Sequence, residues 1–158
     1  EVVRHDAGHV AHAGRWDLVA LDDDGELRDQ RRCEEHVQLA ITAHGRQIHL
    51  AERSHHYCLL LLARKRLLDA RQGFDAFSQG WITTDSFARM LGVTENHLSM
   101  LLHRARHQLA KECPVAPLHS HCIERRRGEV RFGRFGFQIQ RGCELEAVFD
   151  PRQLAMTV

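Results

Sequence analysis

The chain has 158 residues, of which 43% are hydrophobic and 27% are charged, with a net charge of +1, and this composition is typical of a globular protein. No apolar run approaches the roughly 18 residues that a membrane-spanning helix needs, since the longest, Tyr57–Ala63, ends at Arg64. These features exclude a membrane protein, a collagen-like fibre and a fully disordered chain. The start shows no secretion signal and begins with Glu1 rather than methionine, so we expect a cytoplasmic protein that is part of a longer chain or processed.

The N-terminal region is predicted to form strands. Residues 1–15 show no sustained period and are expected to be a linker or a disordered edge. Trp16–Leu21 is a strand candidate, followed by a strong turn signal at residues 22–25. His36–Thr42 and Arg46–Leu50 alternate around a short loop, which predicts an antiparallel hairpin.

A long helix is predicted over Glu52–Arg71, and Gly73 ends it. Phe74–Gly80 is then expected to be a loop, and Trp81-Ile82 a short strand. The residues expected on the inward face of the helix are Tyr57, Leu60, Leu61, Leu67 and Leu68.

Two helices follow in quick succession. Thr83 or Thr84 is the N-cap of a short helix that Gly92 ends. Thr94 caps a second helix, Glu95–Lys111, which Pro114 and Pro117 stop. The inward residues of this second helix are expected to be Leu98, Leu101, Leu102, Ala105 and Leu109.

The last part of the chain is predicted to form a β-hairpin and a tail. His121–Arg126 and Val130–Gln140 are the two strands of the hairpin, and residues 143–158 are an acidic tail. Phe135, Phe137 and Ile139 alternate, which favours a strand with one face packed on the helices. The fold class is therefore predicted to be α+β.

The positive charge gathers in one stretch. Residues 1–80 carry 11 basic and 13 acidic side chains, residues 81–141 carry 10 and 5, and residues 142–158 carry 1 and 3. A polyanion would bind the middle stretch. Of the 22 basic residues 20 are Arg, and although a GC-rich genome would give the same bias, Arg suits phosphate and guanine recognition better than Lys.

The helix after the tight turn has the length and the polar face of a DNA-reading helix. About 17 residues span about 26 Å, enough to lie along a major groove. Its outward Asn, Ser, Arg and His side chains can read base edges or hold phosphates, although a solvated helix face has the same composition. The candidate DNA-binding residues here are Thr94, Asn96, His97, Ser99, Met100, His103, Arg104, Arg106, His107 and Lys111.

The arginine-rich hairpin adds an independent indication. Arg127-Gly128 is expected near its tip, where a long cation can enter a minor groove or bind a phosphate. The alternative is a charged edge hairpin that arginines keep soluble. The candidate DNA-binding residues of the hairpin are Arg125, Arg126, Arg127, Arg131 and Arg134.

Several short segments in a fixed order carry a family resemblance: Gly45–Leu50, His55–Arg64, Gly80-Trp81-Ile82, Leu91-Gly92-Val93, His97-Leu98, Arg104-Ala105-Arg106 and Ile123–Arg126. Together they make residues 37–142 similar to winged helix-turn-helix domains of the OmpR/PhoB type. The similarity is closer to the winged-helix region of bacterial proteins that carry a forkhead-associated (FHA) domain.

The resemblance implies a winged helix-turn-helix domain over residues 16–142, with an N-terminal antiparallel sheet, three helices and a C-terminal hairpin. Its function would be that of a sequence-specific, double-stranded DNA-binding transcription regulator. Glu95–Lys111 would be the recognition helix and residues 121–140 the wing. Residues 1–35 are too few for the phosphothreonine-binding FHA module of such relatives, and a receiver domain is also absent.

Other chemistry is less well supported by the sequence. His119, His121 and Cys122, with Cys113 nearby, could bind zinc, but no second ligand pair has matching spacing. His5, His9 and His12 could share a helical face, although a solvated tail explains them better in so irregular a segment. No Gly-rich phosphate loop, His-Glu-x-x-His or Gly-x-Ser-x-Gly motif occurs, so we predict no enzyme activity, cofactor or metal.

Cysteine usage favours a reducing compartment. The five cysteines are widely spaced and form no Cys-x-x-Cys pair, so they do not indicate a disulfide framework. Cys58 lies within an apolar helical run and is expected in the core.

The predicted partner is double-stranded DNA, with RNA polymerase and a second copy of the chain as further candidates, and no membrane. The alternative function is a protein–protein interaction module in an FHA-linked phosphothreonine signalling protein, because a winged-helix fold alone does not imply DNA binding.

Overall fold

The computed structural model describes residues 15–20, 37–43, 46–112, 121–133, 135–141 and 144–151. In these ranges three helices and eight strands are found, so the predicted α+β class is confirmed. The predicted linker, the turn at residues 22–25 and the two prolines after the last helix lie outside them. The strands are β1 (Arg15–Ala20), β2 (Gln38–Ala43), β3 (Arg46–His49), β4 (Ile82–Thr83), β5 (Ile123–Arg126), β6 (Glu129–Phe132), β7 (Phe137–Arg141) and β8 (Glu144–Phe149), and the helices are α2 (His55–Arg71), α3 (Thr84–Leu91) and α4 (Glu95–Glu112).

Strands from both ends of the chain form a five-stranded sheet in the order β3-β2-β1-β7-β8. The predicted antiparallel pairing of β2 with β3 is confirmed, and β1 pairs antiparallel with β2. On its other edge β1 pairs in parallel with β7, which aligns Leu18 with Ile139. The expectation of a sheet made of N-terminal strands alone is therefore wrong, because two C-terminal strands complete it.

The predictions for the C-terminal segments also need correction. The hairpin predicted over residues 121–140 ends at Phe132, and β7 belongs to the five-stranded sheet instead. The segment predicted as an acidic tail contains β8, which pairs antiparallel with β7. The reason is apolar burial, since Ala147 and Phe149 lie in the core and the Phe149 ring stacks on Phe137 at 4.9 Å.

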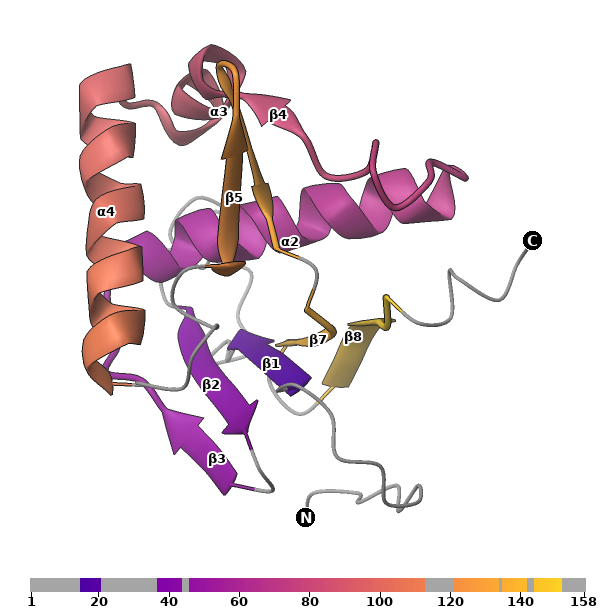
Figure 1. Cartoon of the computed structure of the whole chain (residues 1–158). Helices are drawn as coiled ribbons and strands as arrows, with labels where there is room; N and C mark the ends of the chain where they lie inside the picture. The colour runs from indigo at the N-terminus through magenta and orange to yellow at the C-terminus, as the bar shows by residue number, and fades with distance from the viewer. Residues whose placement is uncertain are drawn as a thin grey trace.

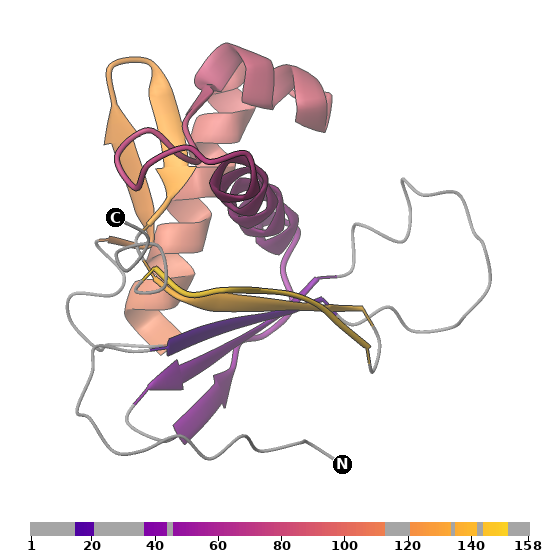
Figure 2. The ribbon, with the colours of Figure 1, turned by 90° about the vertical axis from the view of Figure 1, so that its right-hand side faces the viewer.

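Helix α2 lies over one face of the five-stranded sheet (Figure 2). It begins at His55, three residues later than predicted, and its apolar run is buried over most of its circumference. At its end Gly73, at φ +87°, permits a Schellman turn in which Gly73 N–H donates to Ala70 O and Phe74 N–H donates to Asp69 O. The prediction that Leu68 faces inward is wrong, since its side chain is 52% exposed.

The predicted capping residues define the ends of α3 and α4, two helices that a short turn connects. Thr83 Oγ1 accepts from Ser86 N–H at 3.2 Å, and Gly92, at φ +67°, ends α3. Thr94 Oγ1 accepts from His97 N–H at 3.2 Å at the start of α4. Such N-caps contribute about 1 kcal/mol each. The tight turn between α3 and α4 is thus fixed by Gly92 and Thr94, as the sequence predicts.

One apolar core joins the elements. A second sheet, in the order β4-β6-β5, stands beside α3 and α4, at the end of the molecule away from the five-stranded sheet (Figures 1 and 2). Burying each large apolar side chain contributes about 1.5–3 kcal/mol. Of the residues predicted in the core, Leu60, Phe87, Leu98, Leu102, Ile123, Cys58, Phe137 and Ile139 are buried, while Tyr57, Leu61, Leu91 and Phe135 are partly buried against it.

Candidate nucleic-acid interface

Helix α4 lies beside the β5–β6 hairpin (Figure 1), and most of its exposed side chains are polar. The inward residues predicted from helical spacing are all buried, and they force the intervening side chains outward. Arg106 is the exception among the candidates, because it is only partly exposed. The candidates of this segment that the structure places at the exposed surface are Thr94, Asn96, His97, Ser99, Met100, His103, Arg104, His107 and Lys111.

A buried polar cluster holds the C-terminal half of α4 in place. The side-chain oxygen of Gln108 contacts Nε2 of His55 at 2.6 Å and Nε2 of His56 at 2.7 Å. Its amide nitrogen donates to Ala51 O at 2.7 Å, and this fixes the orientation of the amide. His56 Nδ1 lies 3.0 Å from Val37 O. Helix α4 is thereby tied both to α2 and to the segment that leads into β2.

The surroundings of the buried histidine cluster change the pKa of His55. Desolvation lowers the pKa of His55 below its ordinary value of 6.5, while the hydrogen bond with Gln108 acts in the opposite direction. Electrostatic interaction with His56, Arg53 and Arg104 lowers the pKa of His55 further. The cluster thus favours a neutral His55 in the folded protein.

The hairpin register follows from its two-residue turn, Arg127-Gly128. Gly128 has φ +69°, a conformation that glycine adopts without strain. The turn aligns Arg126 with Glu129 and Glu124 with Arg131. Because side chains alternate across a strand, these four residues share one face of the hairpin, and Arg125 with Ile123 lies on the other.

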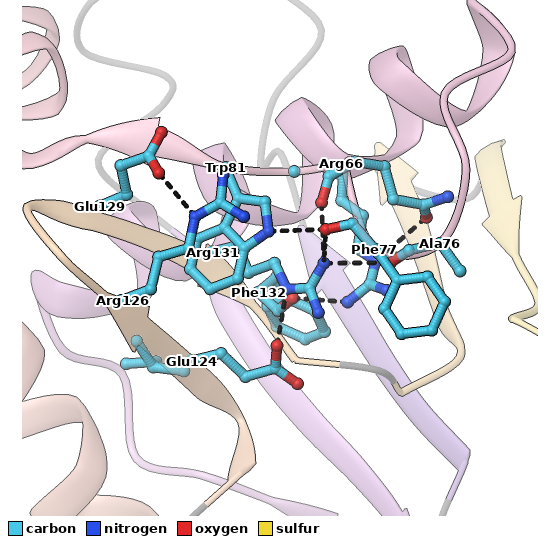
Figure 3. Close-up of polar contacts among 12 residues, drawn as sticks. Arg66, Ala76, Phe77, Trp81, Glu124, Arg126, Glu129, Arg131 and Phe132 are labelled. Atoms are coloured by element: carbon cyan, nitrogen blue, oxygen red, sulfur yellow. Dashed lines mark hydrogen bonds and ion pairs between the residues drawn. The ribbon is translucent and has the colours of Figure 1, made fainter.

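Arg131 holds the hairpin against the loop that follows α2 (Figure 3). It is 2% exposed, and its Nε donates to Glu124 at 2.6 Å. Its Nη1 lies within hydrogen-bonding distance of three carbonyl oxygens of the loop, at 3.0–3.2 Å. Its guanidinium lies 4.4 Å from the centre of the Trp81 ring. The structure therefore places Arg131, a predicted DNA-contacting residue, in the interior among partners of the hairpin and the loop and not at the exposed surface.

Arg126 lies on the same face of the hairpin as Arg131, and its side chain also has partners within the protein. Its Nε donates to Glu129 at 2.6 Å, and its guanidinium lies 4.1 Å from the centre of the Trp81 ring (Figure 3). Its side chain remains 49% exposed. The ion pair neutralises its charge, so the structure removes Arg126 from the unpaired cations on which a DNA contact would rest.

Arg125 on the opposite face of the hairpin and Arg106 of α4 have no acidic partner among the described residues. Arg125 aligns across the hairpin with the buried, apolar Val130 rather than with an acid. Arg106 of α4 reaches the same strand, where its Nη2 donates to Ile123 O at 2.8 Å. Its Nε is shielded from solvent and has no hydrogen-bond partner in that part of the chain, an arrangement that costs about 1–3 kcal/mol.

The charge of Arg106 also acts on Arg125. Desolvation, and then the positive charge of Arg106, lower the pKa of Arg125 below its ordinary value. Arg106 therefore has a structural contact as well as an unsatisfied donor, which differs from the predicted role of a purely outward DNA-contacting residue.

The hairpin tip is anchored to the helix pair. Gly128 O accepts from Thr84 N–H, the first residue of α3, at 3.0 Å. Thr84 Oγ1 donates to Glu95 Oε2 of α4 at 3.2 Å. Arg127 at the tip is exposed and makes no ion pair with any described residue. The tip is thus held to α3 by a backbone hydrogen bond, and a side-chain hydrogen bond links that residue of α3 to α4, while Arg127 at the tip is exposed.

Sequence reasoning missed the role of Trp81, which supports two arginines. The signal was present in the register, because a two-residue turn at residues 127–128 predicts the pairs Arg126–Glu129 and Glu124–Arg131 directly. Trp81 precedes β4, whose Ile82 aligns with Val130, so it lies next to Arg131. Arg134, another candidate, lies outside the described residues.

Metal ligands are not brought together within the described ranges, where no three His, Cys, Asp or Glu side chains form a group that could hold an ion. Cys122 is buried, and desolvation raises the pKa of its thiol to about 11, which disfavours the thiolate that zinc requires. His119 and Cys113 lie outside these ranges. No helix in the described part of the chain is long and apolar enough to cross a membrane.

Comparison with known proteins adds no assignment. No protein-family model, no curated protein and no solved structure matches the chain.

Proposed function

We propose that α3, α4 and the β5–β6 hairpin form a winged helix-turn-helix that binds double-stranded DNA sequence-specifically, as part of a bacterial transcription regulator. Helix α4 would lie in the major groove, and the hairpin would contact the adjacent backbone or minor groove. With 18 residues, α4 is about 27 Å long, which is sufficient for this placement.

The observation that carries the proposal is a set of unpaired cations next to a polar helix face. Arg104 and Lys111 of α4 and Arg125 and Arg127 of the hairpin are exposed and form no ion pair with any described residue. Asn96 and Ser99 lie in the early turns of α4, which usually face base edges in helix-turn-helix proteins. Cations of this kind position a protein on phosphates, and amide and hydroxyl groups specify sequence.

The decisive experiment is an in-vitro selection of duplex sequences by the full chain, followed by titration of the selected duplex at several salt concentrations. With four or five phosphate contacts, log affinity should fall with log salt at a slope of about −4. Enrichment of one sequence together with this slope supports the proposal. No enrichment, or a slope near zero, would contradict it.

A second candidate function is protein–protein interaction, possible for the same fold in an FHA-linked signalling protein. One observation favours it: Leu68, Phe74 and Phe77, around the C-terminal end of α2, are 52%, 48% and 71% exposed. Large exposed apolar side chains are typical of protein-binding sites when they gather in one patch. The same titration separates the two functions, because protein binding requires no affinity for any duplex.

A further inference from the structure

His56, in the first turn of α2, lies between two hydrogen-bond acceptors. Its side chain is closed to solvent, so its ring nitrogens depend on partners within the protein. Nδ1 lies 3.0 Å from Val37 O, and a backbone carbonyl can only accept. Nε2 lies 2.7 Å from Oε1 of Gln108, which can only accept as well. Both contacts are hydrogen bonds only when each ring nitrogen carries a proton, because a neutral imidazole has a single N–H.

The other partners of Gln108 determine which of its side-chain atoms faces the histidines. Its Nε2 donates to Ala51 O at 2.7 Å and to Oε1 of Glu112 at 3.1 Å. A turned amide would place its oxygen against these two acceptors. Oε1 therefore faces both histidines, and it accepts from Nε2 of His55 at 2.6 Å as well as from His56.

Loss of one proton from His56 cannot leave both of its contacts intact. The nitrogen that loses the proton turns a lone pair toward an oxygen, and this replaces a hydrogen bond with repulsion. Loss from Nε2 is the less costly, because Oε1 of Gln108 still accepts from His55. The neutral ring should thus keep its Nδ1–H bond to the buried Val37 and give up Gln108.

We propose that His56 is a proton-sensitive latch between α2 and α4: the doubly protonated ring binds Gln108, and the neutral ring releases it. The N-terminal end of α2 lies against α4 (Figure 1), and Gln108 belongs to the buried side of α4. Because Val37 leads into β2, the closed latch also connects α4 to the five-stranded sheet. Release removes one of the bonds that hold the C-terminal half of α4. The inference goes beyond the proposed function and does not depend on DNA binding.

Other titratable groups lie next to the latch in the described part of the chain. The ring of His55, on the same helix, is nearly perpendicular to that of His56, with 5.0 Å between the ring centres. The carboxylate of Glu112, on α4, accepts from the side-chain amide of the latch, and the segment before β2 contributes a carbonyl. Arg53 and Arg104 act electrostatically on His55. A pH response of α4 must therefore be assigned to one group among these.

The first experiment follows side chains of the full chain by ¹⁵N NMR from about pH 5 to about pH 9. We expect both ring nitrogens of His56 to carry a proton at the acidic end, and Nε2 alone to lose it as the pH rises. The side-chain amide resonances of Gln108 should shift with the same midpoint. A ring that loses the Nδ1 proton, keeps one protonation state throughout, or titrates without a response of Gln108 would overturn the proposal.

The same spectra separate His56 from its titratable neighbours. The ring nitrogens of His55 and of the exposed His97, at the start of α4, give midpoints of their own. A response of Gln108 that follows either of these midpoints instead would refute the assignment to His56. Glu112→Gln removes the carboxylate and retains an acceptor, so the midpoints of Gln108 and His56 should still coincide in this variant.

The second experiment measures amide hydrogen exchange along α4 on either side of the His56 midpoint. After correction for the intrinsic pH dependence of exchange, protection in the C-terminal half should be about tenfold lower when the ring is neutral, and protection in the first two turns should be equal. Gln108→Met removes the acceptor and should abolish the difference, whereas the control Gln47→Met, at an exposed site on β3, should retain it. Equal protection of the wild type in both states would overturn the latch, whether or not Gln108→Met folds.

Discussion

The two faces of the β5–β6 hairpin use the same residue type for opposite purposes. On one face Arg126 and Arg131 lie over Trp81 and pair with acids across the strands. On the other, Arg125 lies opposite the buried Val130 and has no acidic partner among the described residues. The difference teaches that an arginine's role in such a hairpin depends on its place in the alternation and on its cross-strand partner, and that the number of arginines alone is not informative.

The arginines on the two faces of the hairpin also differ in how deeply their side chains are buried. Arg131 is nearly inaccessible and donates to Glu124 and to loop carbonyls, among them that of the buried Gln79, so its removal takes away the partner of a buried polar group. The unpaired arginines keep at least part of their side chains available to a ligand. One face is therefore expected to determine stability and the other affinity, and this division can be tested.

The largest expected effect is on stability, from Arg131→Met. The substitution keeps the length of the side chain but removes the ion pair with Glu124 and the hydrogen bonds to the loop, so the free energy of unfolding should fall by about 3 kcal/mol. Urea denaturation measures it as a lower midpoint at an unchanged slope. As a control, Arg89→Met removes an exposed helix pair with Asp85 and should cost less than about 0.5 kcal/mol. Equal losses would contradict a structural role for Arg131.

Asn96→Ala tests the exposed face of α4 by itself. Asn96 lies in the first turn, where a side-chain amide can form two hydrogen bonds with adenine, so its loss should relax preference at one base step by about 1–3 kcal/mol. Selection profiles of the variant and the wild type measure this change. Identical profiles would remove Asn96 from the set of base-reading residues, while the stability should be unchanged in either case.

The variant Arg127→Ala tests whether the exposed arginine at the hairpin tip contributes to DNA binding. The side chain is exposed and has no ion pair in the described structure, so its removal should weaken binding to every duplex alike by about fivefold and lower the salt slope by about one. Titrations with the selected duplex and with an unrelated one measure both quantities. Unchanged affinity would exclude the hairpin tip from the interface.

A smaller effect is expected from removal of the exposed ion pair between Arg126 and Glu129, on the face of the hairpin where arginines pair with acids. The double variant Arg126→Gln/Glu129→Gln keeps the net charge and removes a pair whose arginine is half exposed, so stability should change by less than about 1 kcal/mol. Affinity for DNA should stay within about twofold. A marked loss of affinity would show that Arg126 leaves Trp81 and Glu129 to contact DNA, and it would break the proposed division of the two faces.

The final prediction concerns the pH dependence of stability, to which histidines contribute near neutrality and arginines do not. Arginine does not titrate near neutrality, so a change of stability there reports on the histidine cluster instead. Because the pKa of His55 is lowered in the fold, mainly by desolvation, the unfolded chain binds the proton more tightly, and stability should fall as the pH drops below 6.5. Denaturation at a series of pH values measures this slope. His55→Asn should flatten it, and an equal slope in the variant would contradict the assignment.

The sequence by itself determined the local structure around the candidate site. Gly92, Thr83 and Thr94 end and begin helices through backbone conformation and capping bonds, and these effects act within a few residues. Helical spacing likewise determined which side chains of α4 face outward. Even the cross-strand pairs of the hairpin follow from its turn once Arg127 and Gly128 are placed at the tip.

Only the tertiary structure decided the long-range assignments. That β7 and β8 complete a sheet with β1 depends on contacts between residues more than a hundred positions apart, and local patterns do not encode such pairing. The burial of Arg131 likewise required the loop after α2 to lie against the hairpin. Distant backbone carbonyls and one aromatic ring thus removed Arg131 from the candidate surface, because a side chain's function depends on which partners the fold brings within a few ångströms.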